Sequence, residues 1–258
     1  MKLTVIGAGN MGGAIARALI RIPGISVSDI TCTARSAATL EKFRCEGFSV
    51  TSDNREAVRD ADFVVFAVKP WMMEEVVRDV APYIVNESQV IMSVAAGVSF
   101  EQLISWLGSA PAMFRVIPNT AIEIGSGVTF ISSCNASEAQ RADVLGMFEQ
   151  MGYAVEIEEE MMGAGTALAS CGIAYAMRYI QASAAGGEAL GFDASQARKI
   201  VEYTVKGAAE LLLATGRDPQ EEISKVTTPG GMTMKGLSAM TDAGFERAVA
   251  EGLSASLK

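Results

Sequence analysis

The sequence predicts an α/β half followed by an all-helical half. Short apolar runs of strand length recur at intervals that leave room for a helix between them, and these strand signals stop near residue 158. Beyond that point the segments read as helices separated by turn signals. An acid-rich run, 156–160, marks the predicted boundary, so the chain is expected to divide into residues 1–158 and 159–258.

Composition and charge describe a globular protein that is not built to bind polyanions. Of the 258 residues, 50% are hydrophobic and 20% are charged, which is enough for a sizeable core. The formal net charge is -9 at pH 7, whereas a nucleic acid or an anionic membrane surface would need a basic face. We therefore expect neither as a partner, and any anionic ligand must be held by local groups.

The sequence offers no set of metal ligands and no export signal. The four cysteines lie far apart without a Cys-x-x-Cys pair, and the chain has no histidine, so no metal site is expected. The first residues run straight into a strand pattern, and no apolar run is long enough to span a bilayer. We expect a cytoplasmic protein.

A glycine-rich loop near the start of the chain predicts a dinucleotide site. The apolar strand 3–6 leads into Gly7-Ala8-Gly9-Asn10-Met11-Gly12, and a segment with helical spacing follows. Gly7 would make the tight turn, Gly9 would let a pyrophosphate reach the backbone, and Gly12 would let the helix lie close to the strand. The phosphates would then lie at the helix N-terminus, as in a Rossmann-type doubly wound sheet.

The end of the second strand points to the phosphorylated form of the cofactor. An acidic residue at this place would bind the ribose hydroxyls of NAD, but the chain reads Thr33-Ala34-Arg35-Ser36. Arg35 can hold a ribose 2′-phosphate, with the hydroxyls of Thr33 and Ser36 as further donors. We therefore expect NADPH to be preferred over NADH. The alternative is an arginine that is merely solvated at the start of a helix.

Three further strands are expected over 48–50, 63–68 and 90–94. Their continuous apolar runs favour a parallel sheet that is covered on both faces. Lys69-Pro70 follows the second of them and Ala95-Ala96-Gly97 follows the third, and both segments should lie beside the glycine loop, where a doubly wound sheet binds its ligand. Lys69 could also be a solvated residue at a strand end.

Two strands, a helix and a last strand complete the first half. The runs 113–117 and 128–131 are predicted as edge strands, and Pro118-Asn119-Thr120 separates them. A helix over 136–150 and a strand over 153–157 are expected to follow.

The helical half begins with a segment that lacks a solvent face. Residues 165–190 are rich in alanine and glycine and apolar nearly all round. A helix of this kind needs partners on every side, which a domain of about 100 residues can hardly supply alone. We therefore expect a homodimer formed by the helical halves. Further helices are predicted over 194–214, 219–226, 232–240 and 243–256.

A loop between two of these helices predicts a second anion site. Thr227-Thr228-Pro229-Gly230-Gly231-Met232-Thr233 combines a proline, two glycines that leave the backbone approachable and three threonine hydroxyls. The helix that begins near Met232 would point its free N–H groups and the positive end of its dipole into the same space. This combination favours a small anion, most simply a carboxylate. An ordinary Thr-Pro-Gly turn with an N-cap is the alternative.

The chain resembles, from end to end, the pyrroline-5-carboxylate reductases, which catalyse the last step of proline synthesis. The resemblance rests on the glycine loop, on Val68-Lys69-Pro70, on Arg115-Val116-Ile117-Pro118-Asn119-Thr120 and above all on the segment from Thr227 to Thr233. Many dehydrogenases share the first motif, whereas the last motif, in a helical C-terminal domain, is much more specific. The resemblance implies reduction of 1-pyrroline-5-carboxylate to L-proline by NADPH, with NADH also used by some members.

The resemblance also implies the residues of the site. Asn54, the glycine loop and the turn from Ala67 to Pro70 would hold NADP(H), and Thr228 and Thr233 would hold the substrate carboxylate. We place the carboxylate on Thr228 and on the N–H groups near Gly231 and Met232, and we place the Thr233 hydroxyl near the ring nitrogen as the catalytic hydrogen-bonding partner. A dimer through the helical domain is implied too, gathered in some members into larger rings. The predicted cofactor residues are Gly7, Ala8, Gly9, Asn10, Met11, Gly12, Thr33, Ala34, Arg35, Asn54, Ala67, Val68, Lys69, Pro70, Ala95, Ala96 and Gly97.

The chain departs from the family pattern in three places. Cys171-Gly172-Ile173-Ala174 stands where a Ser-Gly-Pro-Ala turn is usual in the long helix. Ala121 stands where a proline is usual, and Glu222 stands where an apolar residue is common. These departures bear on the shape of the helix near the site more than on the chemistry, because the groups that are expected to touch the ligands remain.

Three other functions stay open as alternatives. A β-hydroxyacid dehydrogenase would need a catalytic lysine in the first long helix after the Rossmann half, but no lysine lies between Lys69 and Lys199. A non-enzymatic NADP-binding regulator has no need of a second anion pocket, and a general imine reductase lacks a carboxylate clamp.

A chain without histidine is poorly equipped to protonate a ketone. A cyclic imine nitrogen is basic enough to be protonated from solvent, so an imine is the favoured substrate.

Overall fold

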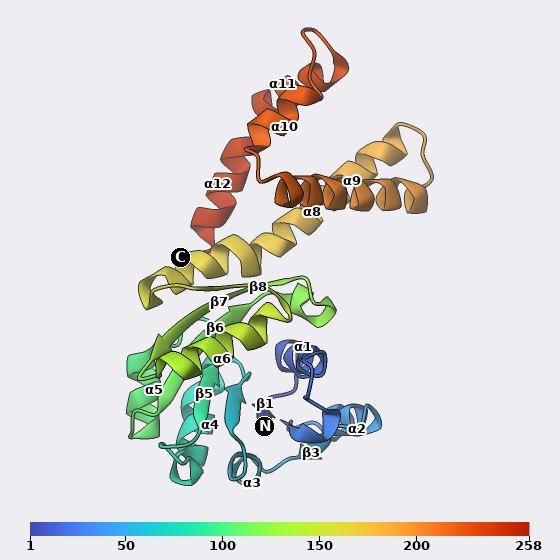
Figure 1. The fold of residues 1–258 in the computed structure, drawn as a ribbon. Coiled ribbons are helices and arrows are strands. Elements are labelled where there is room, and N and C mark those ends of the chain that lie inside the picture. Colours follow the sequence, from blue (N-terminus) through green and yellow to red (C-terminus); the bar gives the residue numbers. More distant parts are fainter. Residues whose placement is uncertain (258) are drawn as a thin grey trace. The chain divides into compact units, whose positions relative to one another are not determined.

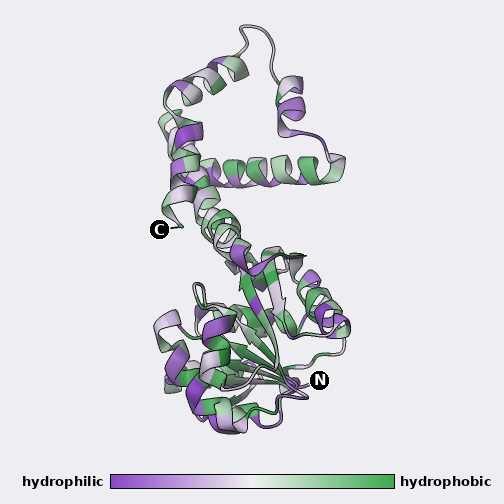
Figure 2. Ribbon diagram, turned by 90° about the vertical axis from the view of Figure 1, so that its left-hand side faces the viewer, coloured by the Kyte–Doolittle hydropathy of each residue, from purple (hydrophilic) through white to green (hydrophobic). Residues whose placement is uncertain are grey.

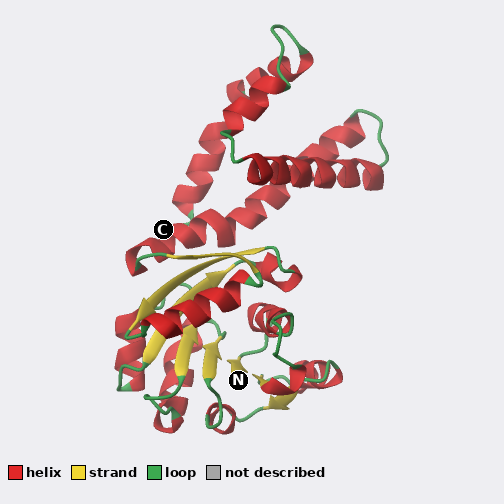
Figure 3. Cartoon of the chain, viewed as in Figure 1, coloured by secondary structure: helices red, strands yellow, loops and turns green. Residues whose placement is uncertain are grey.

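The computed structural model describes residues 1–257, which form two compact units (Figure 1). The first unit covers Met1–Ser170, and the second begins at Cys171. All strands of the described residues lie in the first unit (Figure 3). The division into functional domains after residue 158 stays a prediction, because the compact units describe packing and not the extent of each function.

An eight-stranded sheet forms the centre of the first unit, in the order β3-β2-β1-β4-β5-β6-β7-β8. Strands β1 to β6 are mutually parallel, whereas β7 is antiparallel to β6 and parallel to β8. The order reverses between β1 and β4, as in a doubly wound sheet, so the predicted α/β fold is confirmed. The strands are β1 (Leu3–Ile6), β2 (Ile30–Thr33), β3 (Ser49–Thr51), β4 (Phe63–Phe66), β5 (Val90–Ser93), β6 (Ala112–Pro118), β7 (Gly127–Cys134) and β8 (Gly152–Glu156).

Helices cover both faces of this sheet, which explains why the strands are continuously apolar. Alternate side chains point to opposite faces, so Leu3 and Val5 belong to one buried cluster and Ile6 to the other. Figure 2 shows the hydrophobic residues gathered in the sheet. The first cluster includes residues of α1 (Asn10–Leu19), α2 (Ala37–Cys45) and α6 (Glu138–Glu149), and the second includes residues of α3 (Asn54–Val58), α4 (Met73–Val80) and α5 (Phe100–Leu107).

The prediction that the runs 113–117 and 128–131 form edge strands is wrong. β6 lies between β5 and β7, all of its residues are buried, and β7 lies between β6 and β8. The crossover through α6 adds β8 beyond β7, so the edges of the sheet are β3 and β8. The charge of Arg115 is compatible with an interior strand because its guanidinium pairs with Glu159 at 2.8 Å.

The second unit is built from helices and loops, and local signals define their ends. The side chains of Asp193 and Asp218 accept N–H groups from the first turns of α9 and α10, and Gly216 ends α9 with a φ of 63°. No helix within residues 1–257 is both long and apolar enough to cross a membrane. The helices are α8 (Gly172–Ala189), α9 (Ala194–Thr215), α10 (Pro219–Lys225), α11 (Met232–Asp242) and α12 (Phe245–Ala255).

The helix predicted over 165–190 is not continuous. α7 (Met162–Gly165) leads into a π-helical segment, η6 (Thr166–Cys171), before α8 begins. The hydroxyl of Thr166 donates to the carbonyl of Met162 at 2.7 Å, a bond of the kind that bends helices. Gly165 is pressed against Phe130, since a Cβ there would lie 2.8 Å from the ring. Both features lie where the regular α-helical ladder gives way to η6, at a place where the apolar pattern alone predicts one helix.

The second unit has almost no core of its own. Among residues 171–257 only Ala184 and Ala197 are buried, in α8 and α9. A Cβ on Gly187 would lie 3.1 Å from the Cβ of Ala197, so these two helices approach closely through small residues. Large apolar side chains remain exposed, among them Leu190 and Leu213. This unit therefore needs a further surface to cover its apolar residues.

Candidate active site

The carboxyl ends of β1, β2, β4 and β5 lie side by side. The carbonyl of Thr33, the last residue of β2, accepts the N–H groups of Gly7 and Ala8 at 3.1 and 2.7 Å. The residue after β4 donates to the last residue of β1 at 2.8 Å, and the residue after β5 donates to the last residue of β4 at 3.0 Å. The predicted cofactor segments that follow these strands are thereby brought to one edge of the sheet.

The glycine loop packs tightly against the protein at Gly7 and Gly12, and it is open at Gly9. Gly7 has a φ of 93°, and a Cβ there would lie 2.7 Å from Val68. A Cβ on Gly12 would lie 2.3 Å from the carbonyl oxygen of Gly7, so only glycine lets α1 start here. Apart from its own neighbours in the chain, no atom of the described residues lies within 4 Å of a Cβ built on Gly9. The loop can therefore admit a pyrophosphate at Gly9, as the sequence predicts.

The N-terminus of α1 suits an anion. Gly9 is its N-cap, no side chain caps the helix, and its first turn contains no acid. The N–H of Gly13 makes the first helical bond, to Gly9 at 2.8 Å, so the N–H groups of Asn10, Met11 and Gly12 precede it. These N–H groups and the helix dipole can together hold a phosphate.

Thr33 is buried, and its hydroxyl is engaged within the protein. Its side chain is 1% exposed, and its Oγ1 donates to Oδ1 of Asn54 at 2.6 Å. Because Oδ1 is engaged in this way, the amide –NH₂ is the end of Asn54 that can serve a ligand. The sequence predicts Thr33 as a direct donor to the 2′-phosphate, whereas its burial favours an indirect function in which it orients Asn54.

Arg35 and Ser36 lie on the surface directly after β2. Arg35 takes part in none of the ion pairs that form within residues 1–257, so its charge can serve a ligand. The Ser36 hydroxyl caps α2 by accepting the N–H of Thr39 at 3.4 Å. Lys69 and Pro70 are exposed beside the glycine loop.

The loop after β5 carries the last group of predicted cofactor residues. Ala95 is buried, and its N–H donates to the hydroxyl of Ser93 at 3.4 Å. Ala96 and Gly97 are exposed, and Gly97 has a φ of 77°. The loop ends at Ser99, which caps α5. The backbone at Ala96 and Gly97 is thus accessible at the same edge as the glycine loop.

The sequence prediction missed an ion pair beside this loop, between a buried arginine and a half-buried glutamate. Arg115 of β6 is 8% exposed, and its Nη1 donates to Oε1 of Glu159, in the short helix η5 (Glu159–Met161), at 2.8 Å. The same oxygen accepts the backbone N–H of Phe100, also at 2.8 Å. The signal in the sequence is an arginine inside the apolar run 113–117, because a charge in a buried strand requires a partner.

The predicted substrate loop forms a turn of type II in front of α11. The N–H of Gly231 donates to the carbonyl of Thr228 at 2.9 Å across Pro229 and Gly230, and Gly230 has a φ of 72°. A Cβ on Gly231 would lie 2.4 Å from the Thr228 hydroxyl oxygen, so glycine lets this hydroxyl approach the backbone.

The N-terminus of α11 has the same properties as that of α1. No side chain caps it, no acid lies in its first turn, and Met232, its first residue, is 90% exposed. The side chains of Thr228 and Thr233 are exposed beside it, whereas the Thr227 hydroxyl donates to the carbonyl of Ser224 at 3.2 Å and braces the loop. The predicted substrate residues thus gather around one helix N-terminus that can hold a carboxylate.

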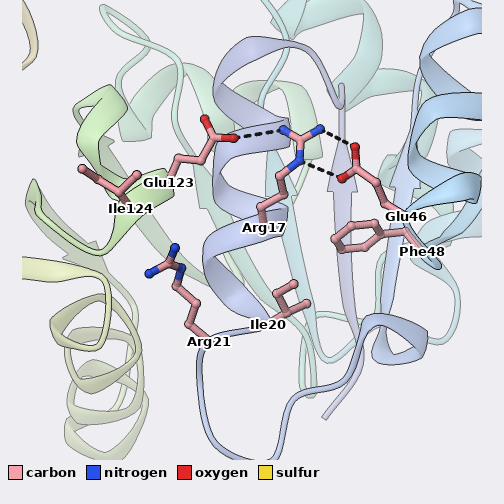
Figure 4. Close-up of a pocket in the computed structure, with 7 residues that line it drawn as sticks. All are labelled: Arg17, Ile20, Arg21, Glu46, Phe48, Glu123 and Ile124. Atoms are coloured by element: carbon pink, nitrogen blue, oxygen red, sulfur yellow. Dashed lines mark hydrogen bonds and ion pairs between the residues drawn. The ribbon is translucent and has the colours of Figure 1, made fainter.

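A hollow of about 770 Å³ lies beside α1, away from the predicted site residues (Figure 4). Arg17 occupies its centre, and its Nε and Nη2 contact the two carboxylate oxygens of Glu46 at 2.7 and 2.9 Å. Its Nη1 contacts Glu123 at 3.4 Å, in the short helix η4 (Thr120–Ile124). The hydrogen bond from Arg17 lowers the pKa of Glu46. Because Arg17 is paired on two sides, we interpret this cluster as structural.

A glycine loop at the carboxyl edge of a doubly wound sheet, next to a helix N-terminus that suits a phosphate, is the arrangement of the NAD(P)-binding proteins. Residues 159–258 match the family model for pyrroline-5-carboxylate reductase dimerisation, and residues 2–97 match the model for NADP oxidoreductase, coenzyme F420-dependent. A pyrroline-5-carboxylate reductase of Aquifex aeolicus is 36% identical over 97% of this chain and 93% of its own length. The chain belongs to the pyrroline-5-carboxylate reductase family.

Further relatives agree with this assignment. Pyrroline-5-carboxylate reductase 1 of Dictyostelium discoideum is 35% identical over 97% of this chain, which spans 48% of that relative's length. The crystal structure of Plasmodium falciparum pyrroline carboxylate reductase with NADP bound is 26% identical, has a TM-score of 0.90 and covers 100% of this chain and 95% of its own. The predicted resemblance is confirmed. Membership of this family removes the dehydrogenase, the general imine reductase and the regulator as alternatives.

Proposed function

We propose that this protein reduces 1-pyrroline-5-carboxylate to L-proline with NADPH, the last step of proline biosynthesis. One observation carries the proposal: each unit contains a helix, α1 or α11, whose N-terminus follows a glycine turn and has neither a side-chain cap nor an acid in its first turn. One such site suits the pyrophosphate of a dinucleotide and the other suits the carboxylate of a small substrate. Membership of the family supports the reaction.

Two groups of loops at this edge of the sheet would each hold one half of the cofactor. The loop from Gly7 to Gly12 would bind the pyrophosphate, and Arg35 and Asn54 would bind the 2′-phosphate. The turn from Ala67 to Pro70 and the loop from Ala95 to Gly97 would lie beside the remaining half, because their strands β4 and β5 lie beyond β1 in the sheet. When bound, NADPH supplies the hydride that reduces the carbon of the C=N bond.

The turn before α11 would hold and orient the substrate. Thr228 and the N–H groups near Gly231 and Met232 would bind the carboxylate, with the dipole of α11 favouring its charge. The Thr233 hydroxyl would hydrogen-bond to the ring nitrogen. This contact orients the imine, which is basic enough to take its proton from solvent, so a chain without histidine can support the reaction.

The assembly that fits these observations is a homodimer joined through the helical halves. The apolar side chains that residues 171–257 leave uncovered support it, as does the match of residues 159–258 to a dimerisation family. We further propose that the enzyme acts in the cytoplasm, since Cys32, Cys45, Cys134 and Cys171 are all free thiols and such thiols persist in a reducing compartment.

The reaction is tested by following NADPH absorbance with the purified protein and two substrates. Pyrroline-5-carboxylate should be reduced much faster than 1-pyrroline, which lacks the carboxylate. Equal rates on the two substrates would contradict the carboxylate site, and no rate on either would contradict the proposed reaction.

A pair of threonine variants tests the substrate contact. Thr233→Ala should lower kcat/KM by about ten-fold or more, because the lost hydrogen bond strengthens in the transition state. Thr227→Ala is the matched control, since its hydroxyl donates to Ser224 within the loop. An equal loss in both variants would assign the effect to loop structure instead.

A further inference from the structure

One carboxylate oxygen joins β6, the neighbour of β5 in the sheet, to the start of α5. Oε1 of Glu159 accepts Nη1 of Arg115 and the backbone N–H of Phe100, both at 2.8 Å. Arg115 pairs in register with Ser93, the last residue of β5, and Phe100 is the first residue of α5. The loop 94–99 runs between Ser93 and Phe100. The strand register fixes the start of this loop, and Glu159 fixes its end.

The exposed part of this loop has little packing of its own. Ala96 and Gly97 are exposed, and the φ of 77° at Gly97 is one that glycine adopts without strain. The bond from Ala95 to the Ser93 hydroxyl is long, at 3.4 Å. Ala95 and Val98, on either side of these two residues, are buried in the second cluster. The position of the Ala96 and Gly97 backbone therefore depends on these two anchors and on how firmly the ends of the loop are held beyond them.

Stability alone gives no reason for a charge at position 115. Arg115 is 8% exposed, and its Nε is buried without a hydrogen-bond partner among the described residues. An ion pair that is largely taken out of water seldom stabilises a fold more than apolar residues do, so an apolar residue of similar volume would serve an interior strand at least as well. Its neighbours Phe114 and Val116 are buried apolar residues. The ion pair is better explained by the geometry that it imposes on its surroundings.

We propose that Arg115 and Glu159 are positioning residues that hold the loop from Ala95 to Gly97 against the nicotinamide half of the cofactor. This inference rests on the proposed function, because it takes that loop as a cofactor contact. Arg35 follows β2, on one side of the point where the strand order reverses, and the loop follows β5, on the other side. A dinucleotide with its 2′-phosphate at Arg35 therefore places its nicotinamide half, and not its adenosine half, beside this loop.

The test compares two ligands on the full-length protein. NADPH spans both halves of the site, whereas 2′,5′-ADP fills only the adenosine half. Glu159→Ala frees one end of the loop, which must then be ordered on binding, so NADPH binding should weaken by about ten-fold while 2′,5′-ADP binding stays within about two-fold of wild type. Glu159→Gln keeps an acceptor for Phe100 and should give an intermediate loss. The two affinities are measured by titration calorimetry.

Glu156→Ala is the matched control. Glu156 also pairs with an arginine, Arg141, at 2.9 Å, and its side chain is 29% exposed, against 32% for Glu159. A general loss of stability should affect both variants alike, and thermal unfolding of each variant measures it. Only the Glu159 variants should lose NADPH affinity selectively.

Two results would overturn the inference. One is an unchanged NADPH affinity in a folded Glu159→Ala protein. The other is an equal loss for NADPH and 2′,5′-ADP, which would indicate a disturbance of the whole edge. If Glu159→Ala does not fold, Glu159→Gln is judged by the same two criteria. A wild-type protein that does not bind NADPH at all would contradict the proposed function itself, before any variant is made.

Discussion

The buried hydroxyl of Thr33 should affect cofactor binding through Asn54. Thr33→Val keeps the shape but removes the donor that Oδ1 of Asn54 accepts at 2.6 Å. An unsatisfied partner of this kind costs about 1 kcal/mol or more, so the Kd for NADPH should rise by about five-fold or beyond. Thr33→Ser retains the hydroxyl and should stay close to wild type in the same fluorescence titration. Equal damage in both variants would mean that the hydroxyl is not responsible.

Arg35 should select between the two nicotinamide cofactors. It is exposed at the end of β2, where a charge-assisted contact with a phosphate contributes about 1.5 to 3 kcal/mol. Arg35→Ala should therefore raise KM for NADPH by about ten-fold or more and leave KM for NADH nearly unchanged. Arg44→Ala, an exposed arginine of α2 that pairs with Glu41, is the control. If KM for NADPH does not move in Arg35→Ala, Arg35 is a surface residue only.

Single residues were predictable from the sequence where their function is local. Gly7 and Gly12 were predictable because a turn and a close helix start follow directly from glycine next to a strand. The pairing of Arg115 with Glu159 joins residues 44 positions apart, and only the folded chain brings them together. The contact of Thr33 with Asn54 has the same origin, since it joins residues 21 positions apart.

At the scale of elements, the apolar runs predicted which segments form strands. They did not predict the order of all these strands in the sheet. The runs that became β1, β4 and β5 are short and continuous, which is typical of strands covered on both faces. Strand order, in contrast, depends on pairing between distant segments, and β8 placed β7 in the interior. The π-helical segment η6 was also not predicted, because an apolar pattern does not distinguish it from an α-helix. It follows Gly165, which lies close to Phe130, a residue 35 positions away in the sequence.

The ion pair between α1 and the end of α2 should make the stability of the first unit depend on pH. The hydrogen bond from Arg17 lowers the pKa of Glu46 below its ordinary value of 4.5. The unfolded chain therefore binds this proton more readily than the folded protein does. The stabilising contribution of Glu46 is present above pH 4.5 and is lost as the pH falls through its lower, folded pKa.

Glu46→Gln should consequently lower the free energy of unfolding at pH 7 and make less difference in acid. Urea unfolding of wild type and variant at pH 7 and at several values below pH 4.5 measures this. The gap between the two proteins should narrow as the pH falls. A gap of constant size would contradict the assigned cause, because it would mean that the charge of Glu46 does not matter to folding.

At the scale of the whole molecule, the two units differ in how they bury apolar surface. Within the described residues, both buried hydrophobic clusters lie in the first unit, whereas residues 171–257 bury only Ala184 and Ala197. The sequence indicated this difference, because its 165–190 segment is apolar nearly all round. The match of residues 159–258 to a dimerisation family supports homo-oligomerisation as the means by which the helical residues are covered.

If helical halves of two chains cover each other, a charge on α9 should disrupt the assembly. Tyr203 is 64% exposed in α9, and Tyr153, 66% exposed in β8 of the first unit, is its matched control. On a free surface both Tyr→Glu changes would have small effects. In the dimer, Tyr203→Glu buries a charge without a partner, so this variant should dissociate while Tyr153→Glu should not.

Light scattering over a dilution series measures the outcome. Wild type should have twice the 27.1 kDa mass of the chain, and its Tm should rise with concentration, because association stabilises the folded state. The measured mass of Tyr203→Glu should approach that of a single chain, and its activity should fall over the same range of concentrations. A wild-type protein that is monomeric, stable and active at low concentration would contradict the dimer. A Tyr203→Glu protein that dissociates no more readily than wild type would remove α9 from the interface.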